Sequence, residues 1–170
     1  MPDATNVQMG VCTVSIDGVD IGHTKGGVEV VYEPEYADVT VDLYGNTPVD
    51  KKLIGEHLKV KIPFAEFTVA NLKKAIANAT LAGAGNARAT LGKKSGQSIS
   101  DVAEQIVIHP IAAGSSRAYD VVLYKAAPIS EVVLAHQVDE QKTIMVEFEA
   151  LIDEGKADGN YLGLLGDSAA

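Results

Sequence analysis

Regular alternation of apolar and polar residues is the dominant pattern in this chain, and it predicts β-strands. Three runs alternate most clearly: residues 38–44, 56–64 and 143–149. In each run the apolar residues share one face and polar or charged residues share the other, which is typical of a half-buried strand. The apolar positions are Val39, Val41 and Leu43, then Leu58, Val60, Ile62 and Phe64, then Ile144, Val146 and Phe148.

Five shorter apolar runs predict five further strands. Pro34, Pro110 and Pro128 are expected to end or separate some of them, because proline cannot donate a hydrogen bond to a neighbouring strand. The runs are residues 11–16, 28–33, 104–109, 118–124 and 130–135.

One helix is predicted after the 56–64 strand. Thr68 is a suitable N-cap, and Val69, Leu72, Ile76 and Ala79 fall on one stripe at helical spacing. The helix is therefore expected to run for about three turns, to Ala79.

Four segments lack periodicity and predict arms or connections. They are an N-terminal arm (1–9), a hairpin tip (45–55), a long Gly/Ala-rich loop (81–100) and a C-terminal arm (155–170). The C-terminal arm holds an apolar island that we expect to dock on a neighbouring subunit. The island consists of Tyr161, Leu162, Leu164 and Leu165.

Together these elements predict a single mainly β domain over residues 1–170. A β-sandwich or barrel-like fold with one flanking α-helix, extended loops and terminal arms accommodates about eight strands and one amphipathic helix.

Composition narrows the class of function. The chain has 14 Lys and Arg against 23 Asp and Glu, a formal net charge of −9, which argues against a conventional nucleic-acid-binding domain. It has no Trp and 5% aromatic residues, which argues against an aromatic platform for glycans. No N-terminal signal segment and no membrane-spanning run are apparent. The single cysteine, Cys12, is expected in a strand as a small core residue.

No constellation of residues points to catalysis or to a metal. His23, His57, His109 and His136 are scattered, without helical spacing to one another or a cysteine beside them. No G-x-S-x-G elbow is present, and the Gly-rich stretch at 82–87 lacks the Lys-Ser/Thr of a phosphate loop. We therefore expect no enzyme activity, no catalytic residues, no metal and no cofactor.

The polar faces of the alternating strands are acidic. Long strands with open polar faces and unpaired edges need closure, and one solution continues the sheet across subunits into a ring. Four carboxylates would then line a channel that repels DNA, so that DNA slides without binding. These residues are Asp38, Asp42, Glu147 and Glu149.

Several segments, in order, resemble the major tail tube proteins of long-tailed, siphovirus-type bacteriophages. The stretch GGVEVVYEPE at 26–35 leads through 38–42 to GNTPVD at 45–50, and the return strand at 56–64 and FTVANLKKAI at 67–76 follow. The ending GNYLGLLGD at 159–167 also fits. The resemblance covers about two thirds of the chain.

This resemblance implies a structural virion protein. Six subunits would form a ring, inner strands would join into a continuous barrel, and rings would stack into a hollow tube through which the genome passes into the host. The implied partners are further copies of the chain, tape measure, tail terminator and baseplate or tail tip proteins, without a membrane. DNA would transit the lumen without specific binding. The implied location is the virion tail, assembled in the host bacterial cytoplasm.

Contact between rings is expected at the hairpin tip, through Asn46, Thr47, Pro48, Val49 and Asp50. Two alternatives stay open. The first is the tube protein of a contractile tail or of a type VI secretion apparatus, which assembles in the same general way. The second is a glycan-binding β-domain.

Overall fold

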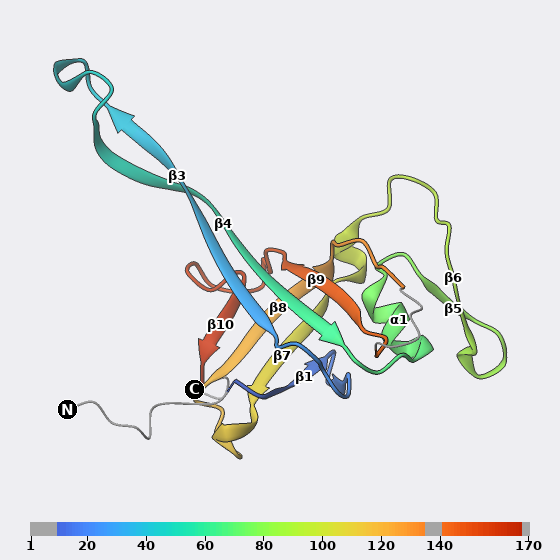
Figure 1. Cartoon of the computed structure of the whole chain (residues 1–170). Coiled ribbons are helices and arrows are strands. Elements are labelled where there is room, and N and C mark those ends of the chain that lie inside the picture. The colour runs from blue at the N-terminus through green and yellow to red at the C-terminus, as the bar shows by residue number, and fades with distance from the viewer. Residues whose placement is uncertain (1–9, 135–140, 168–170) are drawn as a thin grey trace.

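The fold is mainly β, as the alternation predicted, with 46% of residues in strands, 13% in helices and one α-helix. The computed structural model describes residues 10–134 and 141–167 (Figure 1). The predicted N-terminal arm at 1–9, His136 and the last residues of the C-terminal arm lie outside the described residues.

One antiparallel sheet of eight strands forms the body, in the order β2-β1-β7-β8-β9-β4-β3, with β10 also paired to β8. Its strands are β1 (Cys12–Ile16), β2 (Val19–Asp20), β3 (Glu29–Thr40), β4 (Pro48–Phe64), β7 (Glu104–Pro110), β8 (Asp120–Pro128), β9 (Ile144–Ala150) and β10 (Gly163–Gly166). A separate small hairpin consists of β5 (Thr80–Ala82) and β6 (Arg88–Thr90), and the helix is α1 (Val69–Ala75). Short 3-10 turns occupy Asp42–Tyr44, Ala84–Asn86, Ile99–Val102 and Ile111–Ala113.

The sheet curls so that its first strands approach the end of β4. Thr24 forms an antiparallel bridge with Phe64, and the amide of Lys25 donates to the carbonyl of Pro63 at 3.2 Å. These contacts connect the segment after β2 to a strand at the other side of the sheet. The body is therefore barrel-like, as expected from the sequence.

The core fills the concave side of this curled sheet. Phe64 of β4 and Phe148 of β9 are both nearly fully buried, with ring centroids 6.4 Å apart. The predicted strands at 56–64 and 143–149 are confirmed, because the apolar residues predicted to share one face of each strand lie in this core. The core cluster comprises Val14, Ile16, Ile21, Leu58, Val60, Ile62, Phe64, Ala75, Ile106, Ile108, Leu123, Ala126, Ile144, Val146, Phe148 and Ala150.

One edge of β8 is shared between two partners. Its first half, Asp120 to Leu123, pairs with β10, and Ala126 to Pro128 pair with β9. A Cβ at Gly163 of β10 would overlap the carbonyl oxygen of Val122, so only glycine allows this close pairing.

The predicted apolar island at the C-terminus is thereby divided. Leu164 pairs with Val122 through the backbone and is half-buried, and Leu162 packs against the core of its own chain. Tyr161 and Leu165 stay 37% and 67% exposed. Docking of the island on another molecule stays a prediction, with Tyr161 and Leu165 as its more exposed residues.

Strands β3 and β4 continue far beyond the body as a two-stranded arm (Figure 1). Lys59 is the outermost β4 residue that pairs with β9, so β4 from Pro48 to Leu58 pairs with β3 alone. At about 3.3 Å per residue, this part of β4 is roughly 35 Å long. We call residues 34–57 the arm.

The prediction of a half-buried strand over 38–44 is wrong. β3 ends at Thr40, Asp42–Tyr44 form a 3-10 turn at the tip, and Leu43 is 82% exposed. The alternation is present, but the arm has no second layer against which an apolar face packs. The hairpin tip is also shorter than the predicted 45–55, because β4 begins at Pro48.

Pro34 does not end its strand, contrary to expectation, because β3 runs through it to Thr40. Among the described strands, β3 lies at the edge of the sheet and pairs with β4 alone. One side of an edge strand has no ladder hydrogen bonds to lose, so proline is tolerated there.

The predicted strand at 130–135 is also wrong over its described part, because residues 130–134 form no strand. The Ser130 hydroxyl instead accepts a hydrogen bond from the Glu147 amide at 2.9 Å, and Val132 packs against the core. A short apolar run can cover the core as an irregular segment as well as in a strand, so its sequence does not distinguish the two.

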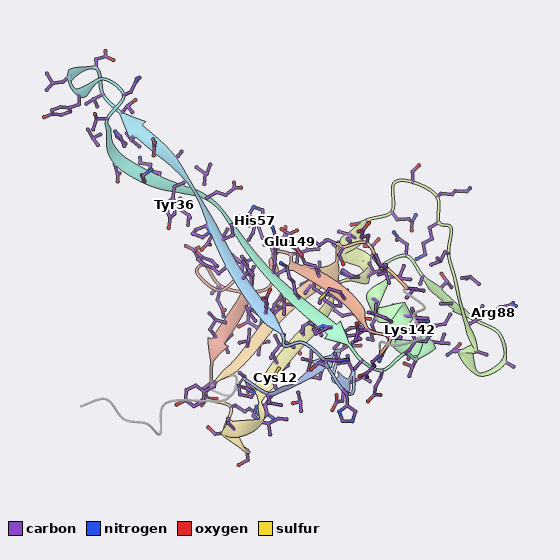
Figure 2. All side chains as sticks on the ribbon, viewed as in Figure 1. Cys12, Tyr36, His57, Arg88, Lys142 and Glu149 are labelled. Carbon is purple, nitrogen blue, oxygen red and sulfur yellow. The ribbon has the colours of Figure 1, made fainter. Side chains whose placement is uncertain are left out.

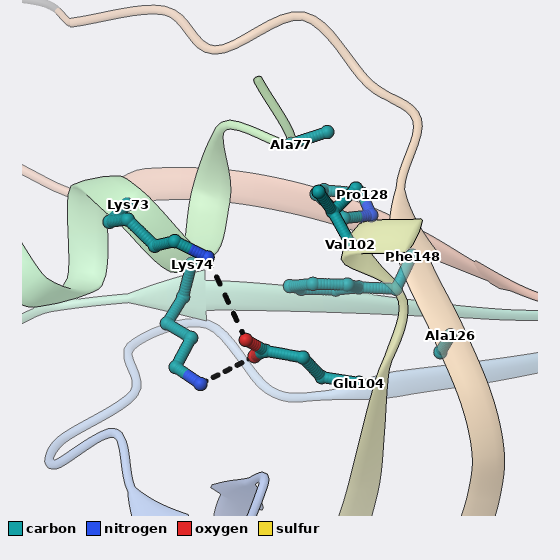
Figure 3. Close-up of a pocket in the computed structure, with 8 residues that line it drawn as sticks. All are labelled: Lys73, Lys74, Ala77, Val102, Glu104, Ala126, Pro128 and Phe148. Carbon is teal, nitrogen blue, oxygen red and sulfur yellow. Dashed lines mark hydrogen bonds and ion pairs between the residues drawn. The ribbon is translucent and has the colours of Figure 1, made fainter. Parts of the chain in front are cut away.

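Helix α1 starts where the sequence predicted. The Thr68 hydroxyl accepts a hydrogen bond from the Asn71 amide at 3.1 Å, which caps the helix. The helix ends at Ala75, one turn before the predicted Ala79. Lys73 and Lys74 both form ion pairs with Glu104 at the start of β7 (Figure 3), so α1 is fixed to the sheet.

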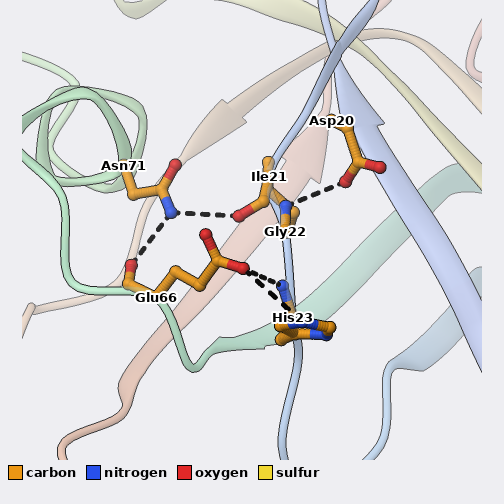
Figure 4. A network of polar contacts seen from close by, with 6 residues as sticks. All are labelled: Asp20, Ile21, Gly22, His23, Glu66 and Asn71. Carbon is orange, nitrogen blue, oxygen red and sulfur yellow. Dashed lines mark hydrogen bonds and ion pairs between the residues drawn. The ribbon is translucent and has the colours of Figure 1, made fainter.

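Asn71 joins α1 to the segment after β2 (Figure 4). Its side-chain amide donates to the carbonyls of Ile21 at 3.0 Å and Glu66 at 2.9 Å, and the side chain is nearly buried. The Glu66 carboxylate in turn accepts from the His23 amide at 2.9 Å. Gly22 lies against this carboxylate with φ +82°, where a Cβ would overlap it.

The predicted long loop at 81–100 contains structure of its own. β5 and β6 form a short hairpin beside α1, with Leu81 opposite Ala89. Two strands of three residues each give too short a pattern for the sequence to distinguish them from a loop.

Candidate functional site

The face of β3, β4 and β9 that lies opposite the core is charged. Strand pairing aligns Glu29 with Lys61 and Glu147, and it aligns Lys59 with Glu149. Because side chains alternate along a strand, residues of the same parity on the three strands share this face. We call it the charged face: Glu29, Glu33, Glu35, His57, Lys59, Lys61, Glu147 and Glu149.

Two cross-strand ion pairs connect β3 to β4 on the charged face. Lys59 Nζ lies 3.3 Å from Glu33 Oε2, and Lys61 Nζ lies 4.0 Å from Glu29 Oε2. The hydrogen bond to Glu33 raises the pKa of Lys59 above its ordinary value. These side chains are largely solvated, so each pair contributes little to stability.

His57 lies between two carboxylates at the base of the arm (Figure 2). Its Nδ1 is 2.8 Å from Glu149 Oε1 on β9, and its Nε2 is 3.6 Å from Glu35 Oε1 on β3. The side chain of His57 therefore connects β9 in the body to Glu35 at the beginning of the arm.

The charged face is net acidic. Five carboxylates against two ammonium groups leave a net charge of −3 when His57 is neutral. Such a surface repels phosphate groups. Within the described residues no helix packs on this face. The side chains of Glu29 and Glu33 are 70% and 61% exposed, whereas those of Lys59 and Glu149 are 27% and 24% exposed.

The structure does not bring together the four acidic residues that the sequence singled out. Glu147 and Glu149 lie on the charged face, whereas Asp38 lies far out on the arm with its Oδ1 2.6 Å from Lys51 Nζ. The alternation of β3 also places Asp38 on the opposite face from Glu33. Asp42 is in the turn at the tip. The lumen-facing position of the four residues stays a prediction, and of the four only Glu147 and Glu149 lie on the charged face.

The arm carries apolar side chains that nothing in the described chain covers. Tyr36 is 55% exposed and pairs with Leu53, which is 50% exposed. Figure 2 shows Tyr36 on the ribbon well away from the body. A two-stranded ribbon has no interior, so such residues favour contact with another surface. The exposed apolar residues from 36 to 54 are Tyr36, Val41, Leu43, Tyr44, Val49, Leu53 and Ile54.

The predicted contact residues between rings all lie at the end of the arm. Asn46 and Thr47 are in its turn, and Pro48, Val49 and Asp50 begin β4. The sequence analysis missed Tyr36, Leu53 and Ile54. Apolar residues on both sides of a Gly-Asn-Thr-Pro turn were the available signal, but Leu53 and Ile54 fell within the predicted hairpin tip and Tyr36 was assigned to no element.

The remaining polar clusters are structural. His109 Nδ1 lies 2.6 Å from Asp120 Oδ1, and its Nε2 lies 2.9 Å from the Gly114 carbonyl. With both ring nitrogens engaged by acceptors, this imidazole is not free to act as a base. Burial raises the pKa of the Cys12 thiol, as expected for a partly buried residue beside the core.

In the described residues, no three or more His, Cys, Asp or Glu side chains are grouped so that they can hold a metal ion. The described part of the chain also has no helix with the length and apolarity needed to cross a membrane. Comparison with the sequence models of known protein families gives no match, and a search among curated proteins finds no similar sequence.

Proposed function

We propose that this protein is a structural subunit that polymerises as stacked rings into a hollow tube, and that the tube is the tail tube of a long-tailed bacteriophage. The observation that carries the proposal is the arm. A two-stranded ribbon with exposed Tyr36, Leu43 and Leu53 exposes apolar area that a second molecule must cover.

The arm suits contact between rings rather than contact within one. It projects from one side of the body, and its tip holds Leu43 and Tyr44 with 82% and 60% of their surfaces exposed. A contact at the end of an arm roughly 35 Å long reaches a subunit in the next layer. Because such a contact joins different surfaces, it repeats along a stack.

The charged face supports a second part of the proposal, that this face lines the lumen of the tube. A channel that conducts DNA needs a surface that is polar, solvated and repulsive to phosphate. The net charge of −3 on the charged face fits this need, and Glu147 and Glu149 are the two sequence-predicted residues on it. The ion pairs of Lys59 and Lys61 with neighbouring carboxylates reduce their attraction for DNA.

Electron microscopy of the concentrated protein, alone and with tail tip proteins, tests the proposal. We expect hollow tubes or six-fold rings with a central pore. A protein that stays monomeric under all these conditions contradicts the proposal. A contractile sheath around the purified particles would instead identify the tube of a contractile tail or secretion apparatus.

The lumen assignment has its own test. Particles with Glu147→Lys and Glu149→Lys should assemble but release DNA more slowly, roughly tenfold, because DNA then meets a cationic wall. Asp101→Lys, a charge reversal at an exposed residue of the Ile99–Val102 turn outside the charged face, is the control. Normal DNA release from the double variant contradicts the assignment.

A further inference from the structure

The charges of the chain are segregated in sequence and in space. Residues 67–100 contain five basic residues and no Asp or Glu, so the rest of the chain carries a net charge of −14 against the total of −9. Lys73 and Lys74 are paired with Glu104, which leaves three basic residues for other contacts. We call residues 80–97 the basic lobe; it consists of β5, β6 and their loops, and its charged residues are Arg88, Lys93 and Lys94.

The basic lobe has an apolar residue among its charges. Leu91 is 68% exposed, between Arg88 on one side and Lys93 on the other. Figure 2 shows Arg88 at the edge of the molecule, pointing away from the body. No ion pair of Arg88, Lys93 or Lys94 is formed within the described residues, so a solvated cationic surface surrounds one apolar side chain.

A groove with complementary properties lies at the base of the arm. It has a volume of about 540 Å³ and separates the arm from β10 and the loop before it. Exposed apolar side chains of Tyr32, Leu53 and Leu165 line it, and the carboxylates of Glu56 and Asp158 stand at its sides. We call it the acidic groove. It contains no basic residue.

The basic lobe and the acidic groove lie on opposite sides of the molecule. In Figure 1, β10 and the adjacent loop lie on the same side of the body as the arm, whereas β5 and β6 lie beyond α1 on the far side. One copy therefore cannot place its own lobe in its own groove. Two different surfaces on opposite sides form a head-to-tail contact, which closes into a ring when the rotation allows.

We propose that the basic lobe of one copy docks in the acidic groove of a second copy and forms the lateral contact within a ring. Leu91 enters the acidic groove and contacts its apolar side chains. Lys93, Lys94 and Arg88 lie against Glu56 and Asp158. This inference rests on the proposed function for its ring, and it assigns a partner to residues 80–97, whose role the sequence left open.

Cysteine cross-linking tests the geometry. In a Cys12→Ser background, one protein carries Leu91→Cys and a second carries Asp158→Cys. Mixed under assembly and oxidising conditions, they should form disulfide-linked dimers that contain one copy of each. Neither protein alone should cross-link above the level of the Cys12→Ser parent. Cross-linking no higher in the mixture than in the single proteins overturns the proposal.

Charge exchange tests the energetics. Lys93→Glu with Lys94→Glu should reduce ring or tube formation at least tenfold without changing the folded monomer. Adding Glu56→Lys and Asp158→Lys, the two acidic residues that line the groove, should restore assembly. Lys25→Glu, at another exposed and unpaired position, is the control and should assemble normally.

The outcomes separate this contact from the proposed function. Wild-type tubes together with normal assembly of the Lys93→Glu/Lys94→Glu protein overturn only the lobe-and-groove contact. If this variant assembles normally but loses binding to a DNA fragment, the lobe-and-groove contact is also overturned, because the basic lobe then binds nucleic acid. A wild-type protein that forms neither rings nor tubes overturns both proposals.

Discussion

His109 and Asp120 meet across β7 and β8, with 2.6 Å between Nδ1 of the ring and Oδ1 of a carboxylate that is 96% buried. The other ring nitrogen lies 2.9 Å from the Gly114 carbonyl. A neutral imidazole has one N–H, so both contacts are donated hydrogen bonds only when His109 is protonated. The hydrogen bonds to Asp120 and Gly114 raise the pKa of His109, against the smaller opposing effects of burial and of the Arg117 charge.

The raised pKa predicts that His109 stabilises the fold most at low pH. A histidine with a higher pKa in the folded state contributes fully below its unfolded value, about 6.5, and loses the contribution as pH rises through the folded value. The difference in unfolding free energy between wild type and His109→Gln should therefore shrink between pH 6.5 and 9. Urea denaturation at a series of pH values measures it, with His23→Gln as a surface control. A difference that is constant over this range contradicts the prediction.

Gly22 is predicted to accept a side chain only if the Glu66 carboxylate moves and gives up its hydrogen bond from the His23 amide. Its φ of +82° disfavours other residues, and a Cβ would overlap the Glu66 carboxylate. Gly22→Ala should therefore lower the unfolding free energy by about 2 kcal/mol or more. Gly18→Ala is the matched control, since Gly18 has φ +72° but open space around it, and should cost about 1 kcal/mol. Equal losses in the two variants would show that the overlap with Glu66 has no cost.

Asn71 is predicted to hold α1 to the body through hydrogen bonds. Asn71→Ala leaves the carbonyls of Ile21 and Glu66 without their side-chain donor in a buried place, which should cost about 1–3 kcal/mol. Thermal or urea denaturation measures this loss. Asn78→Ala, at an exposed position just past the helix, should change stability by less than about 0.5 kcal/mol. A loss at Asn71 as small as that at Asn78 would refute the role.

Leu43 at the tip of the arm is predicted to act in assembly and not in folding. Because its side chain is 82% exposed, Leu43→Ser should leave the unfolding free energy unchanged within about 0.5 kcal/mol. The same variant should form fewer and shorter tubes, as counted by electron microscopy at equal protein concentration. Val133→Ser, an exposed apolar residue remote from the arm, is the control. Tubes of normal number and length from the Leu43 variant contradict a tip contact.

The sequence predicted best where a strand packs on the core. Residues 56–64 and 143–149 alternate because one face of each is buried, and both form strands of the body with the predicted faces. Thr68 likewise marked the start of α1, because capping is a local interaction between residues close in sequence. Helix capping and burial of one strand face can therefore both be recognised from the sequence.

Prediction failed where the same pattern had another cause. Val39, Val41 and Leu43 alternate with polar residues as a buried strand does, yet they belong to the arm and its tip. Alternation with a period of two shows that the two faces of a strand differ in polarity. It does not show that another layer of the protein covers the apolar face. Pairing of Glu147 with Lys61 depends on strands distant in sequence, so the charged face was only half predictable.

The concentration of basic residues in one lobe gives the molecule a large electric dipole. Two copies that approach at random are turned by each other's field before they touch, with the positive side of one toward the negative side of the other. Added salt shortens the range of both this attraction and the repulsion between two net charges of −9. For the proposed contact between lobe and groove, the salt dependence of the encounter rate therefore reports which of the two is the stronger.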